Sequence, residues 1–185
     1  MMNKVIKLLQ QGEVIALFQG RSEAGARALG NRSLIFNPTI EGMNDYVNEI
    51  KGREKYRPVA ATVLSQQVYD WFDTDRLANS PYMSFAFGVR DNKRKLIPAV
   101  VHVDGTCRVQ TVTEEQNKNY YNLIDEFYKV SGVPLVGNTS LNLAGEPLVE
   151  KLDQALDILQ RSKIKYLYLP EKRKLITNWY EYRWH

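Results

Sequence analysis

Apolar residues recur at helical spacing in five parts of the chain. The first is residues 3–11, and we expect Gly12 to end that helix. Thr113 and Gln116 have the spacing of a capping box, which predicts a helix that runs to about residue 130 and is closed by Gly132. The remaining predicted helices cover residues 44–51, residues 65–72 with Ser65 as the cap, and residues 148–162.

Short apolar runs between these segments predict buried strands. The runs are residues 14–18, 58–64, 83–89, 133–137 and 164–169. Residues 97–103 and 106–112 flank Asp104 and Gly105, a pair favoured in two-residue turns, so we predict a β-hairpin there. The alternation of strands and helices predicts one mixed α/β domain over residues 1–185, with flanking helices on an open twisted sheet.

Composition excludes several classes of protein. The 185 residues hold one cysteine, which rules out a disulfide framework, and two histidines, which argue against a multi-histidine metal site. No apolar run approaches the roughly 20 residues of a membrane span, and the amino terminus lacks the apolar stretch of a signal peptide. We therefore expect a cytoplasmic protein with no membrane partner. The net charge of +4 suits an anionic ligand or nucleic acid without choosing between them.

Two segments concentrate positive charge beside predicted strands. In residues 20–33, three glycines allow close backbone approach and three arginines offer forked donors to phosphate oxygens. The same residues would also suit a solvated loop whose arginines pair with Glu23. Residues 50–58 include four positive charges within seven positions, and such clusters either bind polyanions or lie in water. Arg57 is the least suited to water, because Pro58 and the following strand draw its backbone inward.

Two further segments place polar side chains on or beside strands. Strand alternation over residues 102–110 would put Arg108 in a polar stripe, where it could meet an anion, and Cys107 on the opposite, apolar side. We expect Cys107 to lie in the core without a nucleophilic role. Residues 137–142 carry short amide and hydroxyl side chains that can bind a phosphate or a carbonyl oxygen, or form an ordinary turn.

Taken together, these segments resemble the C-terminal domain of the NodU/CmcH-type carbamoyltransferases. The matching stretches are SEAGARALGNRSLIFNPT, MNDYVNEIKGREKYRPVAATVL, HVDGTCRVQTV and GVPLVGNTSLNLAGEPLVE, and the resemblance spans roughly residues 12–170. It implies a YrdC-like fold that binds ATP, with Mg²⁺ alongside. It also implies that carbamoyl phosphate is broken down to carbamate, which attacks the α-phosphate of ATP to give carbamoyl-adenylate and pyrophosphate.

The resemblance implies a role for ten residues. Those that would act in catalysis, by holding the phosphates and the carbamoyl group, are Lys51, Arg53 and Arg57. Those that would bind substrate and nucleotide are Arg27, Arg32, Ser33, Arg108, Asn138, Ser140 and Asn142, the last three through the phosphate or the carbamoyl carbonyl. Catalysis in such a site is mostly positioning and electrostatics, so it needs no evident general base.

In the family, this domain follows a first half that carries metal-binding histidines, whereas here the domain begins near residue 1. We therefore expect a split O-carbamoyltransferase, in which this chain forms the adenylate and a separate N-terminal-type subunit with the metal site performs the transfer. An apolar docking face for that subunit is expected at the aromatic stretch 179–185 or at Trp71 and Phe72.

Two other functions stay open. A threonylcarbamoyl-adenylate-type synthase for tRNA modification would share the fold and ATP but would also bind threonine and bicarbonate. The stretches GARALGNRS and IKGREKYRP favour the carbamoyltransferase over this synthase. A non-catalytic nucleotide- or nucleic-acid-binding module of the same fold would bind with a steep salt dependence and without ATP turnover. Nucleic acid is a possible but not an expected partner.

Overall fold

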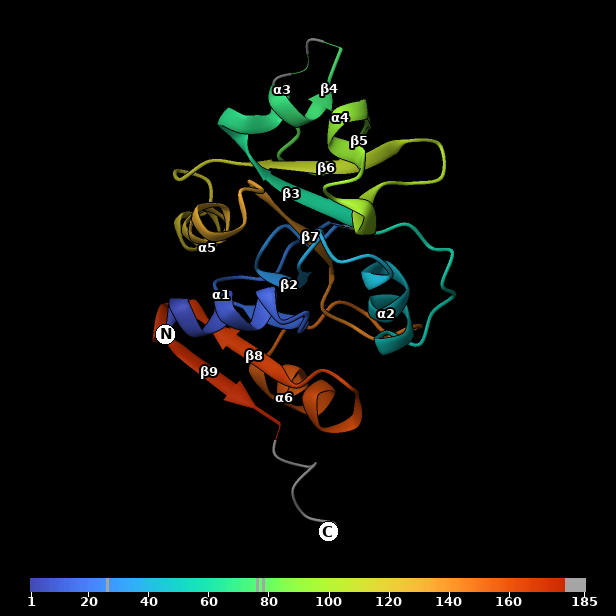
Figure 1. Cartoon of the computed structure of the whole chain (residues 1–185). Coiled ribbons are helices and arrows are strands. Elements are labelled where there is room, and N and C mark those ends of the chain that lie inside the picture. Colours follow the sequence, from blue (N-terminus) through green and yellow to red (C-terminus); the bar gives the residue numbers. More distant parts are fainter. Residues whose placement is uncertain (26, 76, 78, 179–185) are drawn as a thin grey trace.

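The computed structural model describes residues 1–25, 27–75, 77 and 79–178. The strands of this part are β1 (Ile15–Phe18), β2 (Arg32–Phe36), β3 (Ala60–Leu64), β4 (Phe72–Asp73), β5 (Phe85–Val89), β6 (Thr106–Val112), β7 (Leu135–Ser140), β8 (Tyr166–Leu169) and β9 (Lys174–Thr177). They form one mixed sheet in the order β4-β5-β6-β3-β7-β2-β1-β8-β9 (Figure 1). The predicted open mixed α/β sheet is confirmed.

Helices flank this sheet. In the described residues they are α1 (Met2–Gln10), α2 (Met43–Ile50), α3 (Val68–Trp71), α4 (Asp91–Arg94), α5 (Lys118–Ser131) and α6 (Leu152–Arg161). Helices α1 and α5 pack against each other, and Figure 1 shows α2 on the opposite side of the molecule. Across the described ranges, every helix is too short or too polar to span a bilayer.

Local signals in the sequence define several helix ends. The Thr113 and Gln116 side chains each accept a hydrogen bond from the other residue's backbone N–H, as a capping box requires. Helix α5 nevertheless begins only at Lys118, because the Asn117 side chain accepts from the backbone N–H of Tyr120 and caps the helix there. Gly132 ends α5 with a φ of 72°, a left-handed conformation that favours glycine.

The predicted hairpin over residues 97–112 is wrong. Residues Pro98–Val100 form a 3₁₀ turn, and a tight turn through Asp104 and Gly105 leads from there into β6. The antiparallel neighbour of β6 is β5, and its other neighbour is β3 in parallel. Pro98 has no backbone N–H to give to a strand ladder, and the apolar side chains around it are buried in the core.

Other boundaries also differ from the predictions. The helix predicted over residues 65–72 is a 3₁₀ turn followed by α3, and Phe72 already belongs to β4. The strand predicted over residues 133–137 continues as β7 to Ser140, because it pairs with β2 along this length. Strands β2, β4 and β9 were not predicted.

One of the two predicted docking faces is excluded. Trp71 and Phe72 are 4% and 0% exposed and pack within the core, so they offer no apolar surface to a partner. The ammonium group of Lys93 also lies 4.7 Å from the centre of the Trp71 ring. The other predicted face, residues 179–185, lies outside the described residues.

The register of three central strands places polar side chains in one row. Ala60 on β3 pairs with Arg108 on β6 and with Asn138 on β7. Paired residues point to the same face of a sheet, so the side chains of Arg108 and Asn138 flank the small Ala60 on one face. Cys107 points to the other face and is fully buried, as predicted, and burial raises the pKa of its thiol to about 12.

A glycine on β7 permits the close packing of β2. A Cβ at Gly137 would overlap the ring of Phe36, which lies opposite it on β2. We expect Gly137→Ala to lower the free energy of unfolding by about 1–3 kcal/mol, measured by urea denaturation. Gly88→Ala is the matched control, because its Cβ would lie 3.8 Å from the nearest atom, a carbon of Asp73. Equal losses in the two variants would contradict the overlap.

Candidate functional site

A cavity of about 110 Å³ lies where the row of β6, β3 and β7 meets two loops. Its apolar lining is mostly small and includes Ala28, Pro58 and Ala60. Its polar lining comes from Arg27, Arg53, Arg108, Asn138, Thr139 and Ser140, with no acidic side chain among the described residues that line it. We call this the arginine cavity. Its volume is below the roughly 300–1,000 Å³ typical of pockets for drug-sized ligands, so it suits a small anion.

Arg53 is held in place by a neutral group. Its Nε donates to Oδ1 of Asn48 at 2.5 Å, and Nδ2 of Asn48 donates to the backbone carbonyls of Lys55 and Arg57 at 2.9 and 2.8 Å. Nη2 of Arg53 is buried without a hydrogen-bond partner. Burial, and secondarily the charge of Arg57, lower the pKa of the Arg53 guanidinium. An anion in the cavity would satisfy Nη2 and offset the charge.

Asn48 itself was missed by sequence reasoning. It is fully buried on α2, and it connects the helix to the loop that carries Arg53. Its position between the apolar residues Val47 and Ile50 could have indicated a structural role, because a buried amide must form hydrogen bonds.

Arg108 and Arg27 add further positive charge. Burial lowers the pKa of the Arg108 guanidinium, and the nearby charge of Arg27 lowers it further. In the part of the chain that is described, neither of these two arginines nor Arg53 forms an ion pair with a carboxylate. Their charge therefore stays available to a ligand.

Lys51 lies behind the cavity and not on its surface. Its ammonium group donates to the carbonyl and to Oδ1 of Asn142, at 2.7 and 2.8 Å, and to the carbonyl of Ser140. The Ser140 hydroxyl in turn donates to Oδ1 of Asn142 at 2.6 Å. Burial, with a smaller contribution from Arg53, lowers the pKa of Lys51 to about 7. These contacts hold the end of β7, whose Ser140 lines the cavity.

The glycine-rich loop of residues 20–31 is held by a carboxylate. Oε1 of Glu23 accepts backbone N–H bonds from Leu29, Asn31 and Arg32 at 2.7, 2.9 and 3.4 Å. Glu23 therefore binds the backbone of the loop and forms no ion pair with its described arginines, although its charge partly offsets the burial that lowers the pKa of Arg32. It shapes the backbone that presents Arg27 to the cavity.

Arg32 and Ser33 lie apart from the arginine cavity. The Arg32 guanidinium is buried, stacks 3.7 Å from the centre of the Phe18 ring and donates only to backbone carbonyls. These carbonyls belong to Gln19, Gly20, Asn31 and Glu150. The Ser33 hydroxyl accepts from the backbone N–H of Gly30 at 3.0 Å. Both side chains thus fix the backbone on either side of the loop.

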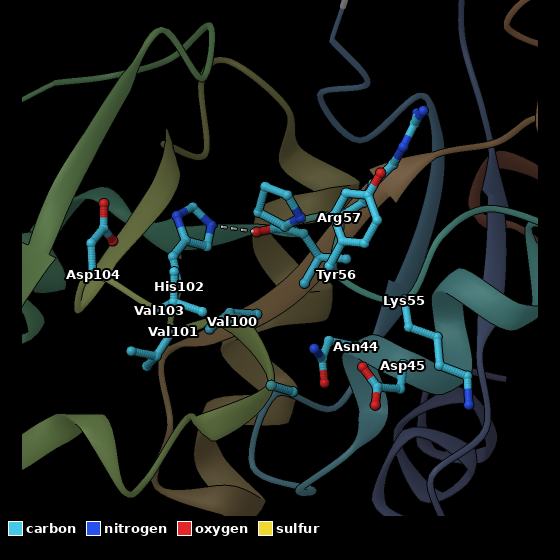
Figure 2. Close-up of a pocket in the computed structure, with 13 residues that line it drawn as sticks. Asn44, Asp45, Lys55, Tyr56, Arg57, Val100, Val101, His102, Val103 and Asp104 are labelled. Atoms are coloured by element: carbon cyan, nitrogen blue, oxygen red, sulfur yellow. Dashed lines mark hydrogen bonds between the residues drawn. The ribbon is translucent and has the colours of Figure 1, made fainter.

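A larger cavity of about 420 Å³ lies beside the arginine cavity, and the two share Pro58 and Val59 in their linings. Figure 2 shows it between Asn44 and Asp45 on one side and His102 on the other, with the Arg57 guanidinium directed away from His102. Arg57 pairs with Glu54 at 2.6 Å. We call this the neighbouring cavity.

His102 borders the neighbouring cavity as a structural group. Its Nε2 contacts the carbonyl of Val59 at 3.0 Å, and its Nδ1 contacts the hydroxyl of Thr106 at 3.2 Å. Both ring nitrogens are therefore occupied within the fold, which leaves neither free to move a substrate proton.

The structure brings most of the ten predicted residues together. Arg27, Arg53, Arg108, Asn138 and Ser140 line the arginine cavity, while Lys51 and Asn142 support it through Ser140. Among the described residues, no three His, Cys, Asp or Glu side chains gather as a metal site. Mg²⁺ prefers carboxylate and phosphate oxygens. Because the described lining of the arginine cavity offers no carboxylate, its residues do not fit a Mg²⁺ ion held directly by this cavity.

Comparison with known proteins adds an independent finding. Residues 6–174 match the family described as "Carbamoyltransferase C-terminus". The nodulation protein NolNO of Sinorhizobium fredii is 42% identical over 156 residues, which are 83% of this chain and 23% of that protein. The nodulation protein NolO of Bradyrhizobium diazoefficiens is 39% identical over 150 residues, which are 80% of this chain and 27% of that protein. The chain thus spans about a quarter of these relatives.

The fold of this chain is similar to that of a solved structure. The crystal structure of P. abyssi Sua5 complexed with L-threonine superposes with a TM-score of 0.61 at 14% identity. The likeness covers 91% of this chain and 46% of that one. At this identity it shows a shared fold.

Burial of Lys51 has a consequence for stability. Unfolding restores the ordinary pKa of 10.5, so above pH 7 the unfolded chain holds a proton that the folded chain has released. Stability contributed through Lys51 therefore rises with pH between these values. Relative to Lys51→Met, we expect the wild-type free energy of unfolding to rise by roughly 2–3 kcal/mol from pH 7 to pH 9.

Urea denaturation at several pH values measures this difference. Lys95→Met, at an exposed lysine, is the control and should follow the wild-type profile. Parallel profiles for wild type and Lys51→Met would show that the Lys51 ammonium stays charged in the folded chain.

Proposed function

Because the chain belongs to the carbamoyltransferase C-terminal family, we propose that it uses ATP to convert carbamoyl phosphate to carbamoyl-adenylate. We take residues 1–185 as one domain that acts in the cytoplasm. The observation that carries the proposal is the arginine cavity, which three arginines line and where Nη2 of one of them, Arg53, is buried without a partner among the described residues. Such a site is built for a small, strongly anionic ligand.

The chemistry takes two steps. Water first cleaves the bond between the carbamoyl carbon and the bridging oxygen of carbamoyl phosphate, giving carbamate and phosphate. An oxygen of carbamate then attacks the α-phosphorus of ATP, and the bond to the leaving pyrophosphate breaks. Arg53 and Arg108 would hold the phosphate of the first substrate, and Arg27 would face the nucleotide. Charge develops on phosphoryl oxygens in the second step, where preorganised cations stabilise the transition state.

The other residues of the matching motifs would position the cavity lining or bind phosphate beside it. Lys51 and Asn142 would position Ser140, which lines the cavity, through their mutual hydrogen bonds. Arg32 and Ser33 would hold the loop that presents Arg27. Arg57 lines the neighbouring cavity and pairs with the exposed carboxylate of Glu54, which it would exchange for a substrate phosphate.

Transfer of the carbamoyl group to an acceptor hydroxyl would take place outside this chain. The relatives are about four times as long as the segment matched here, so their remaining part is the proposed site of transfer, in the same polypeptide or in a separate subunit. Mg²⁺ would arrive bound to ATP, since the described cavity residues supply no carboxylate for it.

Pyrophosphate release tests the proposed reaction. We expect the purified chain, given ATP and Mg²⁺, to release pyrophosphate only when carbamoyl phosphate is added. Arg108→Met should reduce this release at least about tenfold, because it removes a charged contact to the phosphate. Arg94→Met is the matched control, since this half-exposed arginine pairs with Asp91 away from the cavity lining.

Other outcomes point elsewhere. Release that needs threonine and bicarbonate would identify a threonylcarbamoyl-adenylate-type synthase. Nucleotide or nucleic acid binding with a steep salt dependence and no release, even with the remaining part of a relative added, would favour a non-catalytic module. Full release by Arg108→Met would contradict the cavity as the phosphate site.

A further inference from the structure

Asn138, a residue that lines the arginine cavity, has a buried polar atom with no partner among the described residues. Asn138 is fully buried on β7 and lines the cavity. Its amide nitrogen is hydrogen bonded, but its Oδ1 is buried without any hydrogen-bond partner among the described residues. A buried acceptor without a donor is costly, so its persistence at a ligand cavity points to a donor on the ligand.

The orientation of the Asn138 amide is set by its surroundings. Nδ2 donates to the backbone carbonyl of Ala28 at 3.1 Å and to the hydroxyl of Thr62 at 3.0 Å. A carbonyl oxygen can only accept, so the nitrogen and not the oxygen of the amide must face Ala28. Turning the amide over would place two oxygens against each other and leave the nitrogen in the cavity.

A directional chain of hydrogen bonds reinforces this orientation. The Tyr120 hydroxyl donates to the Thr62 hydroxyl at 3.0 Å, and Thr62 donates to Oε1 of Gln110 at 2.8 Å. Nε2 of Gln110 donates to the carbonyl of Leu29 at 3.0 Å, which fixes the Gln110 amide by the same reasoning. Nδ2 of Asn138 also lies 3.3 Å from Oε1 of Gln110, so both of its N–H groups have acceptors within the fold and Asn138 can offer a ligand only an acceptor.

An acceptor at this position is selective. It repels phosphate and carboxylate oxygens, which carry lone pairs and negative charge, and it favours an N–H group. The arginines that line the same cavity favour the anionic end of a ligand. The cavity therefore suits a small molecule with an anionic group at one end and an N–H donor at the other.

We propose that Oδ1 of Asn138 accepts a hydrogen bond from the carbamoyl –NH₂ group and so selects carbamoyl phosphate over other acyl phosphates. This inference rests on the proposed function and deepens it. It replaces the role implied by the family resemblance, in which Asn138 binds the phosphate or the carbamoyl carbonyl. Acetyl phosphate has the same shape but carries a methyl group in place of –NH₂, and it leaves Oδ1 unsatisfied. A site that hydrogen bonds to a donor on its substrate strongly rejects an analogue that lacks this donor.

Two stable analogues isolate this contact. Phosphonoacetamide and acetonylphosphonate both replace the bridging oxygen of the acyl phosphate by –CH₂–, and they differ only in –NH₂ against –CH₃. We expect titration calorimetry to show that the wild-type chain binds phosphonoacetamide at least about tenfold more tightly. Asn138→Ala should bind the two analogues with equal affinity, because the discriminating acceptor is gone.

The matched control is Asn3→Ala, which makes the same change at an exposed asparagine of α1 outside the cavity lining and should keep the wild-type preference. Thermal denaturation checks the fold of each variant. Asn138→Thr, which suits a strand and keeps a short donor toward Ala28, takes the place of the alanine variant if that variant does not fold.

The outcomes separate this inference from the proposed function. Equal binding of the two analogues by the wild-type chain, or a preference that survives removal of the Asn138 amide, would overturn the role of Oδ1 while the anion site stood. Failure of both analogues to bind, together with no carbamoyl-phosphate-dependent release of pyrophosphate, would overturn the proposed function and this inference together.

Discussion

Three arginines line the arginine cavity with no carboxylate among the described residues of its lining, and this constraint shapes much of the surrounding structure. Pairing with acids would satisfy the arginines and remove the charge that a ligand needs. The fold instead holds them by neutral means: Asn48 binds Arg53 through its amide oxygen, and the register of β6 on β3 places Arg108 beside Asn138. Burial and mutual repulsion lower the pKa of Arg108, a cost that an anion would offset.

Neighbouring charged groups stabilise the backbone that carries these arginines. Glu23 accepts three backbone N–H groups, Arg32 donates to four backbone carbonyls, and Lys51 holds the end of β7. From the sequence alone such residues would be predicted to contact a ligand, because the sequence shows their charge but not the groups that they bind in the fold. Here the partner is most often the backbone of a loop, so these charges position the site without lining it.

Sequence patterns were reliable where the relevant contacts are local. The capping box, the end of α5 at Gly132 and the apolar environment of Cys107 each depend on a few neighbouring residues, and all are present. The predicted family is also confirmed, because four separate motifs occur in order along the chain. The predicted hairpin is wrong because the Asp104–Gly105 turn is present but the choice of strand partner is not local: β5 and β3, which are distant from this turn in the sequence, pair with the two edges of β6. The sequence did not indicate that Thr62 and Tyr120 orient the Asn138 amide, because each residue fits an ordinary position in the core.

The sequence by itself determined the family, the alternation of strands and helices, and the set of charged segments from which a site could be drawn. These features follow from local periodicity and from motifs, which need no knowledge of distant contacts. Only the tertiary structure decided which arginines face one cavity, that Arg32 and Lys51 serve the backbone, and which atom of Asn138 is left free. The physical reason is that an amide or a guanidinium has several hydrogen-bonding atoms, and partners far away in the chain determine which of them remain for a ligand.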